Sequence, residues 1–334
     1  MTEIALQDER FMTTANAAKR AQALDRLRTR DEIFRILTFA AAIGVLALLS
    51  GVMISLVAGS LPALRAFGFG FLVSERWNPV TEIFGALPAI YGTVITSFVA
   101  MLIAVPVGLL IAYFLTELCP QRLRQPIGIA IELLAGIPSI IYGIWGLFVF
   151  APFLQETLQP LLINTLGNVP WIGGLFAGPP YGIGLLTSGL ILAIMVLPFI
   201  SSISRDVFDS VPAVLKEAAY GLGCTKWEVI RHVVLPYTRV GVIGGIMLAL
   251  GRALGETMAL AMLVGNANQI SVSLFSPANT LAALLANNFP EARPKDVAVL
   301  MYAALVLLAI TLLVNMIGAV ILERTSLEAE GGKA

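Results

Sequence analysis

The sequence predicts an all-α integral membrane protein with six transmembrane helices and both termini in the cytoplasm. Composition is the first reason: 58% of the 334 residues are hydrophobic and only 13% are charged, whereas soluble domains carry about 25% charged residues. The second is a series of apolar runs long enough to cross a hydrocarbon core of about 30 Å. The third is that lysine and arginine concentrate in alternate connections between these runs.

The chain divides into tails, connections and apolar runs. Residues 1–35 are predicted as a cytoplasmic N-terminal tail and residues 58–90 as an extracytoplasmic connection. Residues 91–322 form a core with five of the spans, and residues 323–334 form a second cytoplasmic tail. The start does not resemble a signal peptide, because a long polar stretch precedes the first run. The six predicted spans are Ile36–Val57, Tyr91–Leu115, Ile127–Phe150, Tyr181–Ile203, Arg239–Gly265 and Ala298–Leu322.

The orientation follows from the positively charged residues. The two tails, the 116–126 turn and the 204–238 loop are rich in lysine and arginine, and the alternate connections are poor in them. Cationic connections stay on the cytoplasmic side during membrane insertion. The sequence therefore predicts that the 204–238 loop lies in the cytoplasm.

The fifth run carries two charges in its middle, Arg252 and Glu256. A charge at the centre of a bilayer costs about 2.5–3.5 kcal/mol on insertion scales. A separation of four residues places both side chains on one helix face, about one turn apart. Two interpretations remain open: the pair lines a polar pathway, or it is a structural Arg–Glu pair that fixes helix packing.

The 204–238 loop is long and patterned. Ser210 is predicted to cap a first short helix, and Gly221 and Gly223 to end it, because glycine adopts a positive φ without strain. A second helix then runs up to Pro236, which is predicted to stop it.

The start of the second loop helix has a recognisable signal. Thr225 followed by Glu228 forms a capping box, in which each residue satisfies the backbone N–H of the other. Two interpretations of the helical loop remain: an amphipathic segment on the lipid surface, or a rigid surface offered to a soluble partner.

The loop resembles the EAA loop of ABC importer permeases, although its glycine spacing departs slightly from the usual pattern. In that family the loop is a coupling helix that docks in a groove of the ATP-hydrolysing subunit. The resemblance implies an ATPase-coupling role for Glu217, Ala218, Ala219, Gly221, Gly223, Leu235 and Pro236.

Four segments, one of them within this loop, are similar to permeases of the PstC type from high-affinity phosphate ABC importers. They are FGALPAIYGT (84–93), IAIELLAGIPSIIYGIWG (129–146), KEAAYGLGCTKWEVI (216–230) and GVIGGIMLALGRALGETMA (241–259). The resemblance implies a transport subunit that is not itself an enzyme. It also implies four partners: a second permease of the PstA type, an ATPase dimer, an extracytoplasmic phosphate-binding protein and the bilayer of the bacterial inner membrane.

The chemistry of phosphate fits this resemblance. Each negative charge that enters a cell against about 100 mV costs about 2.3 kcal/mol, so import needs an energy source. The chain has no G-x-x-x-x-G-K-[ST] motif, so hydrolysis is expected in a separate subunit. Arg252 is predicted to contact the anion and Glu256 to hold the guanidinium when the site is empty or to accept a proton from phosphate. Thr257 and Ser139 are further candidates for the pathway lining.

Other classes of function are less compatible with the sequence. A gated anion channel would use an intramembrane arginine but not the EAA loop. A membrane enzyme would need a cluster of nucleophiles or metal ligands, and the chain has one histidine and two unclustered cysteines. No cofactor, metal or nucleic acid is indicated. Another oxyanion, such as molybdate, sulfate or phosphonate, remains an alternative substrate.

Overall fold

The computed structural model describes residues 2–331, with side chains described for residue 28 and for residues 30–325. The chain separates into two compact units, the residues up to Ala58 and those from Gly59 onward. The first unit is a single helix, the larger part of α1 (Thr2–Phe67). Its large apolar side chains between Ile33 and Ile54 are exposed, as expected of a helix that meets lipid or other helices.

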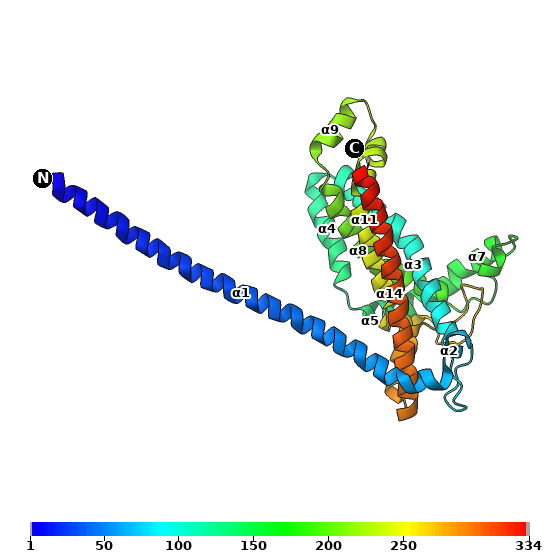
Figure 1. Ribbon diagram of the computed structural model, residues 1–334. Coiled ribbons are helices and arrows are strands. Elements are labelled where there is room, and N and C mark those ends of the chain that lie inside the picture. Colours follow the sequence, from blue (N-terminus) through cyan, green and yellow to red (C-terminus); the bar gives the residue numbers. More distant parts are fainter. Residues whose placement is uncertain (1, 332–334) are drawn as a thin grey trace. The chain divides into compact units, whose positions relative to one another are not determined.

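The second unit contains the end of α1 and thirteen further α-helical segments (Figure 1). Several are continuous with π-helical turns, so that one long helix contains more than one labelled segment. In chain order the segments are α2 (Gly70–Val73), α3 (Leu87–Tyr113), α4 (Gln121–Ala135), α5 (Ser139–Trp145), α6 (Ala151–Phe153), α7 (Gln159–Leu166), α8 (Leu185–Asp209), α9 (Ala213–Gly221), α10 (Lys226–Val229), α11 (Leu235–Leu254), α12 (Met258–Leu263), α13 (Leu281–Asn288) and α14 (Pro294–Gly331).

Six helices in the described chain are long and apolar enough to cross a membrane, which confirms the predicted number. Their bounds are Arg30–Phe67, Leu87–Leu118, Ser139–Leu166, Leu185–Asp209, Lys226–Leu254 and Pro294–Thr325. Extended structure in the described residues is limited to one isolated antiparallel bridge between Asn78 and Ile83. The all-α membrane fold predicted from composition is therefore confirmed.

The third predicted span, Ile127–Phe150, is wrong in its position. The helix breaks at residues 136–138, and the membrane-length helix begins only after the break, at Ser139, and continues to Leu166. Pro138 is the physical reason, because its ring disfavours helical backbone in the residue before it and it donates no hydrogen bond. The Tyr142 hydroxyl donates to the Leu134 carbonyl at 2.9 Å, which satisfies one of the carbonyls freed at the end of α4.

The helix α8 is the centre of the bundle and packs against α3, α4 and α11. About 67% of its most apolar stretch is buried, compared with 33% or less in the other spans. Glycines permit these close approaches. A Cβ atom built on Gly189 would lie 2.6 Å from Val99, and one on Gly245 would lie 2.8 Å from Ile203. Small residues at crossing points are the usual means of packing helices in lipid, where no hydrophobic force drives them together.

Gly92 on α3 allows an even closer approach, because a Cβ atom there would lie 2.0 Å from the Asn279 carbonyl oxygen. We therefore expect Gly92→Ala to destabilise the protein by about 1–3 kcal/mol, as overpacked cores do. Thermal unfolding in detergent, followed by loss of the monodisperse peak, measures this effect. Gly244→Ala is the matched control, since nothing lies within 4 Å of the position that its Cβ atom would take. Equal midpoints for the two variants would contradict the expectation.

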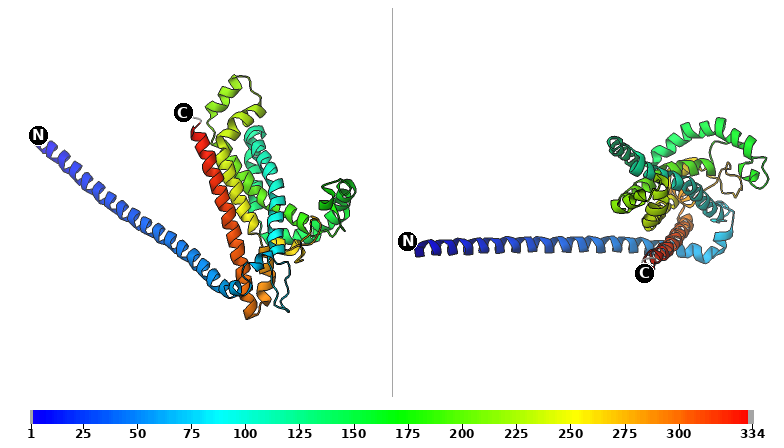
Figure 2. Two further views of the ribbon diagram at one scale, coloured as in Figure 1. Left: turned by 45° about the vertical axis from the view of Figure 1, so that its right-hand side comes forward. Right: turned by 90° about the horizontal axis from the view of Figure 1, so that it is seen from above.

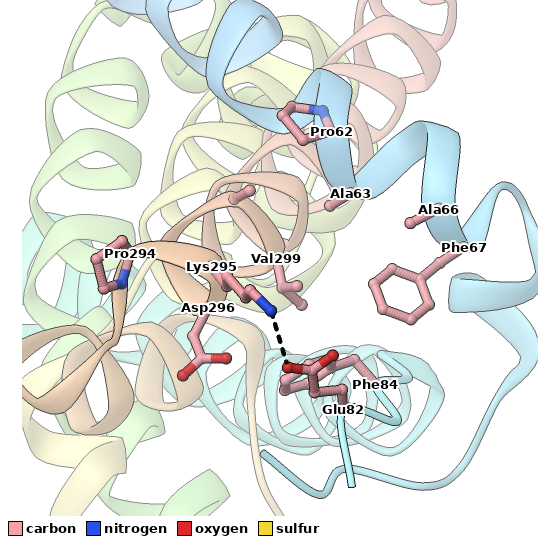
Figure 3. A pocket seen from close by; sticks show the side chains of 11 residues that line it. Pro62, Ala63, Ala66, Phe67, Glu82, Phe84, Pro294, Lys295, Asp296 and Val299 are labelled. Atoms are coloured by element: carbon pink, nitrogen blue, oxygen red, sulfur yellow. Dashed lines mark ion pairs between the residues drawn. The ribbon is translucent and has the colours of Figure 1, made fainter. Parts of the chain in front are cut away.

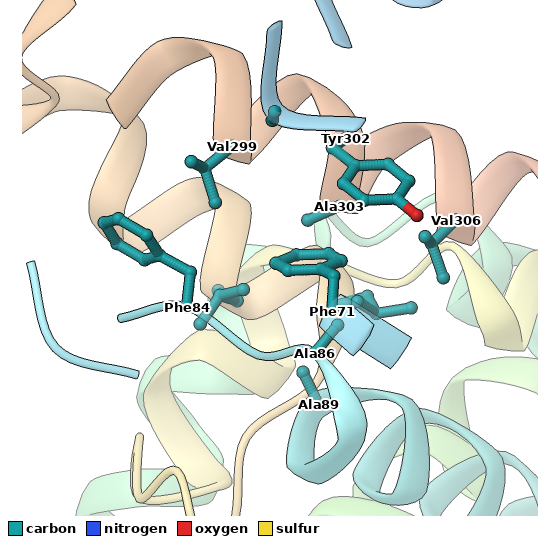
Figure 4. Packing of buried hydrophobic residues seen from close by; sticks show 11 residues of the cluster. Phe71, Phe84, Ala86, Ala89, Val299, Tyr302, Ala303 and Val306 are labelled. Carbon is teal, nitrogen blue, oxygen red and sulfur yellow. The ribbon is translucent and has the colours of Figure 1, made fainter. Parts of the chain in front are cut away.

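The two ends of the bundle differ in character. The helix α9 and the C-terminal end of α14 lie at one end, and α2 and the N-terminal end of α14 lie at the other (Figures 1 and 2). At the second end, the Phe71 and Tyr302 rings stack at 4.6 Å between centroids (Figure 4). They belong to a buried cluster that joins α2, α3, α13 and α14. The 58–90 connection is thus folded back onto the bundle from Gly59 onward.

A cavity of about 320 Å³ opens beside this cluster, between the end of α1 and the start of α14 (Figure 3). Phe67 and Phe84 supply an apolar side, and Lys295 approaches the Glu82 carboxylate at 3.5 Å across it. Arg293 pairs with Asp296 at 2.8 Å, and this hydrogen bond raises the pKa of the Arg293 guanidinium. These charges are outside the apolar zone, as expected at a membrane surface.

Candidate substrate pathway and coupling loop

The two intramembrane charges do not lie on one continuous helix. The helix α11 ends at Leu254, and α12 begins at Met258. Gly255 caps the end of α11, and the Thr257 hydroxyl donates to the Gly255 carbonyl at 3.1 Å. A local side-chain bond of this kind competes with the helical hydrogen-bond ladder. The predicted placement of Arg252 and Glu256 one turn apart on one helix face is therefore wrong.

Arg252 occupies the last turn of α11 and is exposed in the single chain. Its guanidinium carbon lies 4.5 Å from the centre of the Phe199 ring, within the range of a cation–π contact. Among the residues that the structure describes, Arg252 forms no ion pair. The expected contact between the guanidinium and Glu256 is thus not present in this state, and neither is the alternative structural pair.

The depth of Arg252 follows from its neighbour. Phe199 lies near the middle of α8, whose 25 residues span about 37 Å at 1.5 Å per residue. The arginine over that ring is therefore deep in the bundle, far from either membrane surface. An exposed arginine at this depth would cost several kcal/mol, on the order of 3 or more, if it faced lipid. This side of the chain must be covered by protein or by water.

Glu256 lies in the break itself, and only 8% of its surface is exposed. Thr257 follows it at partial exposure and directly precedes α12. The helix α12 therefore begins beside a buried carboxylate and a partly exposed hydroxyl. Unwound backbone within a membrane bundle is tolerated where it lines a cavity or is enclosed by protein.

Ser139 begins the second interrupted helix and is partly buried. The two short helices that follow the breaks, α5 and α12, pack on each other. A Cβ atom on Gly143 would lie 3.1 Å from the Ala259 Cα atom and 3.0 Å from the Met262 sulfur. The structure thus brings the two breaks, and with them Ser139 and Thr257, to the start of one packed helix pair. The sequence alone did not predict that these breaks belong together.

The 204–238 loop has the helical content that the sequence predicts. Ala213–Gly221 forms α9, and Gly223 has a φ of 87°, the positive value expected where the chain turns. The capping box is confirmed: the Thr225 amide donates to the Glu228 carboxylate at 2.7 Å, and the Glu228 amide donates back to the Thr225 hydroxyl at 3.4 Å.

Two details of the predicted loop are wrong. Ser210 does not cap α9; its hydroxyl donates to the Val207 carbonyl and ends α8, and Pro212 occupies the N-terminal position of α9 instead. Pro236 does not stop the second helix, because Lys226–Leu254 is continuous. A π-helical turn directly before Leu235 widens the helix where the proline ring would otherwise meet the preceding turn.

The loop is fixed to the bundle by a buried apolar cluster. Ala219 of α9 packs there with Val229 and Val234 of the second loop helix and with Ala112 of α3 and Phe208 of α8. Of the three EAA residues, Ala219 is the one that faces inward, while Glu217 and Ala218 are exposed. The small alanine allows α9 to lie close to the bundle, so the loop is a rigid part of the fold.

An ion pair that the sequence did not reveal adds to this attachment. The Lys216 ammonium lies 2.6 Å from the Glu117 carboxylate, with 18% and 14% of their side chains exposed. Burial raises the pKa of the Tyr220 phenol, and the negative charge of Glu117 raises it further. The pair links α9 to the π-helical turn that follows α3, and the separation of 99 residues between the partners hides it from local sequence patterns.

We expect Glu117→Gln to loosen α9, because hydrogen bonds to charged groups contribute about 1.5–3 kcal/mol. Amide hydrogen exchange in residues 213–221 should become roughly tenfold faster or more. The double exchange Glu117→Lys with Lys216→Glu should restore slow exchange. Lys295→Ala is the control, since its pair with Glu82 is exposed and worth little. Unchanged amide exchange in α9 of the Glu117→Gln variant would show that the ion pair does not hold α9 against the bundle.

The outer surface of the loop is apolar as well as charged. Leu222 is 87% exposed, and Val214 and Trp227 are also exposed. Glu217 of α9 is exposed as well. Exposed apolar side chains on a rigid, well-packed element are typical of a protein-docking surface.

Comparison with known proteins agrees with these features. The family model described as "Binding-protein-dependent transport system inner membrane component" matches residues 104–326. The protein named phosphate transport system permease protein PstC of Mesorhizobium japonicum is 67% identical over 275 residues, which is 82% of this chain and 84% of that protein. Its namesake in Pasteurella multocida is 54% identical over 301 residues, covering 90% of this chain and 94% of the relative.

Solved structures share the fold at lower identity. A bacterial alginate ABC transporter, crystallised with a periplasmic protein that binds an alginate pentasaccharide, aligns with a TM-score of 0.59 at 18% identity. That alignment covers 87% of this chain and 93% of the transporter chain. The MetNI methionine ABC transporter, inward facing, aligns with a TM-score of 0.52 at 19% identity over 75% of this chain and 99% of that one.

The fold of this chain is therefore that of an ABC importer permease. Its six apolar helices make it a multi-pass protein of the inner membrane. The chain belongs to the family of binding-protein-dependent transport system inner membrane components, and to the group of PstC permeases within it.

Proposed function

We propose that the chain is the permease subunit of an ATP-driven importer of inorganic phosphate. The observation that carries the proposal is Arg252, an exposed arginine over the middle of α8 with no acidic partner among the described residues. The 67% identity to a protein named for phosphate transport supports the choice of anion. A planar guanidinium suits phosphate because it can donate two parallel hydrogen bonds to two oxygens.

The exposed side of Arg252 faces the translocation pathway and the second permease, which is of the PstA type. A guanidinium that faced lipid would cost several kcal/mol. Facing a water-filled pathway between two permease subunits, it remains hydrated until an anion arrives. The cation–π contact with Phe199 orients the guanidinium without neutralising its charge.

The residues near the helix breaks have supporting roles. Glu256 accepts a hydrogen bond from a protonated phosphate oxygen, and its negative charge prevents the anion from being trapped beside Arg252. Thr257 and Ser139, each next to the start of a packed half-helix, offer hydroxyl groups to the passing anion. Discontinuous helices that meet near the substrate are a recurring arrangement in transporters.

The energy for transport comes from a separate ATPase dimer that docks on α9. Leu222 and Val214 supply apolar contact, and Glu217 and Ala218 supply the exposed part of the EAA segment. The α9 end is cytoplasmic, because most of the lysine and arginine residues of the connections lie there. The opposite end, with the 266–297 connection, receives an extracytoplasmic phosphate-binding protein.

A complementation experiment tests the proposal. Cells that lack their own high-affinity phosphate permease should grow on low phosphate when they express this chain with its partners, and should not grow with the partners alone. Purification of the chain should recover an ATPase and a second permease. An anion channel would also restore some uptake, but it would not retain an ATPase. Growth rescue for sulfate or molybdate instead of phosphate would overturn the choice of substrate.

A further inference from the structure

The sixth span carries a polar amide, Asn315, within its apolar stretch. It lies on α14 among exposed apolar residues, with Leu312, Leu313 and Met316 as neighbours in the sequence. Asn315 is itself exposed, and its amide makes no hydrogen bond within the described part of the chain. A side-chain amide can donate two hydrogen bonds and accept two. None of these hydrogen bonds is made within the described part of the chain.

A second polar residue on the same helix behaves differently. The Thr311 hydroxyl donates to the Leu307 carbonyl at 2.9 Å, four residues earlier. A hydroxyl satisfied by its own helix is compatible with any surroundings, including lipid. The amide of Asn315 makes no such bond to its own helix, unlike the Asn288 amide, which donates to the Leu284 carbonyl at 2.8 Å. The amide of Asn315 therefore needs a partner outside its own unit or water.

The position of Asn315 connects it with the proposed anion contact. A Cβ atom on Gly251, the residue before Arg252, would lie 3.8 Å from the Asn315 amide oxygen. One turn along the same interface, Gly318 of α14 packs closely on Met247 of α11. Gly251 has no side chain between α11 and the Asn315 amide. The amide therefore lies beside the last turn of α11.

Asn315 is also deep in its own helix. The next charged residue of α14, Glu323, comes eight residues later, which is about 12 Å along a helix. Asn315 and Arg252 are therefore at a similar depth, and both are exposed polar groups of neighbouring helices. Two polar side chains exposed on adjacent helices at a similar depth in the bilayer point to a shared polar surface.

We propose that Asn315 is a second anion contact on the translocation pathway, and this inference rests on the proposed phosphate-import function. Its amide N–H donates to an oxygen of the anion while Arg252 holds the charge. Its carbonyl oxygen accepts a hydrogen bond from the proton that phosphate retains at neutral pH. A neutral amide contributes hydrogen bonds without adding a second positive charge. The anion is therefore not bound too tightly to leave the site.

The test uses the complete complex reconstituted in proteoliposomes, with the ATPase, the second permease and a phosphate-loaded binding protein. Uptake of labelled phosphate is measured per mole of assembled complex for Asn315→Ala and for the isosteric Asn315→Asp. We expect uptake to fall about tenfold with alanine and further with aspartate, because its negative charge repels the anion. ATP hydrolysis stimulated by the loaded binding protein should persist in the alanine variant. Thr311→Val should transport normally.

Each result decides the inference. Uptake by Asn315→Ala equal to that of the wild type would overturn the role of Asn315 and leave the proposed function standing. Equal uptake by the Asn315→Asp and Asn315→Ala variants would also overturn it. A negative charge at position 315 would then have no effect on the anion, so the side chain would not contact it. If the wild-type complex takes up no phosphate with ATP, the proposed function fails, and this inference fails with it.

Discussion

Replacing Arg252 with alanine should reduce phosphate uptake roughly 100-fold or more. Removing one member of a desolvated charge contact costs about 2–5 kcal/mol, and each 1.4 kcal/mol is a factor of ten. Arg252→Lys should retain part of the activity, since it keeps the positive charge but loses the planar pair of donors. Uptake per assembled complex, measured in proteoliposomes, gives the comparison.

The control for this prediction lies one turn earlier on the same helix face. Leu248 is exposed like Arg252, and Leu248→Ala removes a comparable side chain without removing a charge. Its uptake should remain within about twofold of the wild type, because an apolar side chain donates no hydrogen bond and carries no charge for the anion. Normal transport by both Arg252 variants, in complexes that assemble fully, would refute the assigned role.

Placing a charge on the coupling surface should separate the permease from its ATPase. We expect Leu222→Glu to cut recovery of the ATPase during purification, and uptake with it, by about tenfold or more. A buried unpaired charge in an interface costs several kcal/mol. Leu222 is 87% exposed in the single chain, so the substitution should leave the fold of the permease itself unchanged.

Val80→Glu provides a control with the same exposure. Val80 is also 87% exposed, but it belongs to the 58–90 connection, whose helix α2 lies at the opposite end of the bundle from α9 (Figure 1). This variant should bind the ATPase normally. Retention of the ATPase by Leu222→Glu would mean that α9 does not dock through this surface.

The sequence predicted the number of membrane helices and most of their positions, because length and apolarity are local properties. It also predicted the Thr225–Glu228 capping box, whose two partners are three residues apart. The interruptions of helices were harder to place. Gly255 and Thr257 together end α11 in the middle of an apolar run, whereas Pro236, a strong breaker in isolation, is accommodated by a π-helical turn.

Contacts between distant segments could not be predicted from local patterns. The Lys216–Glu117 pair joins residues 99 positions apart, and Asn315 meets α11 only through the packing of two spans. The approach of α5 to α12 depends on the glycine at position 143 and on the helix break before Ser139. The sequence therefore indicated which residues carry the chemistry, but the fold determines which of them share a surface.

The most direct test of the proposed function is ATP-dependent uptake of labelled phosphate by the reconstituted complex, with sulfate and molybdate as competitors. We predict uptake against a gradient that requires ATP, that unlabelled phosphate suppresses, and that an excess of sulfate or molybdate leaves unchanged. Uptake that proceeds down its gradient without ATP would indicate a channel. Suppression by sulfate or molybdate would indicate a different oxyanion as the substrate.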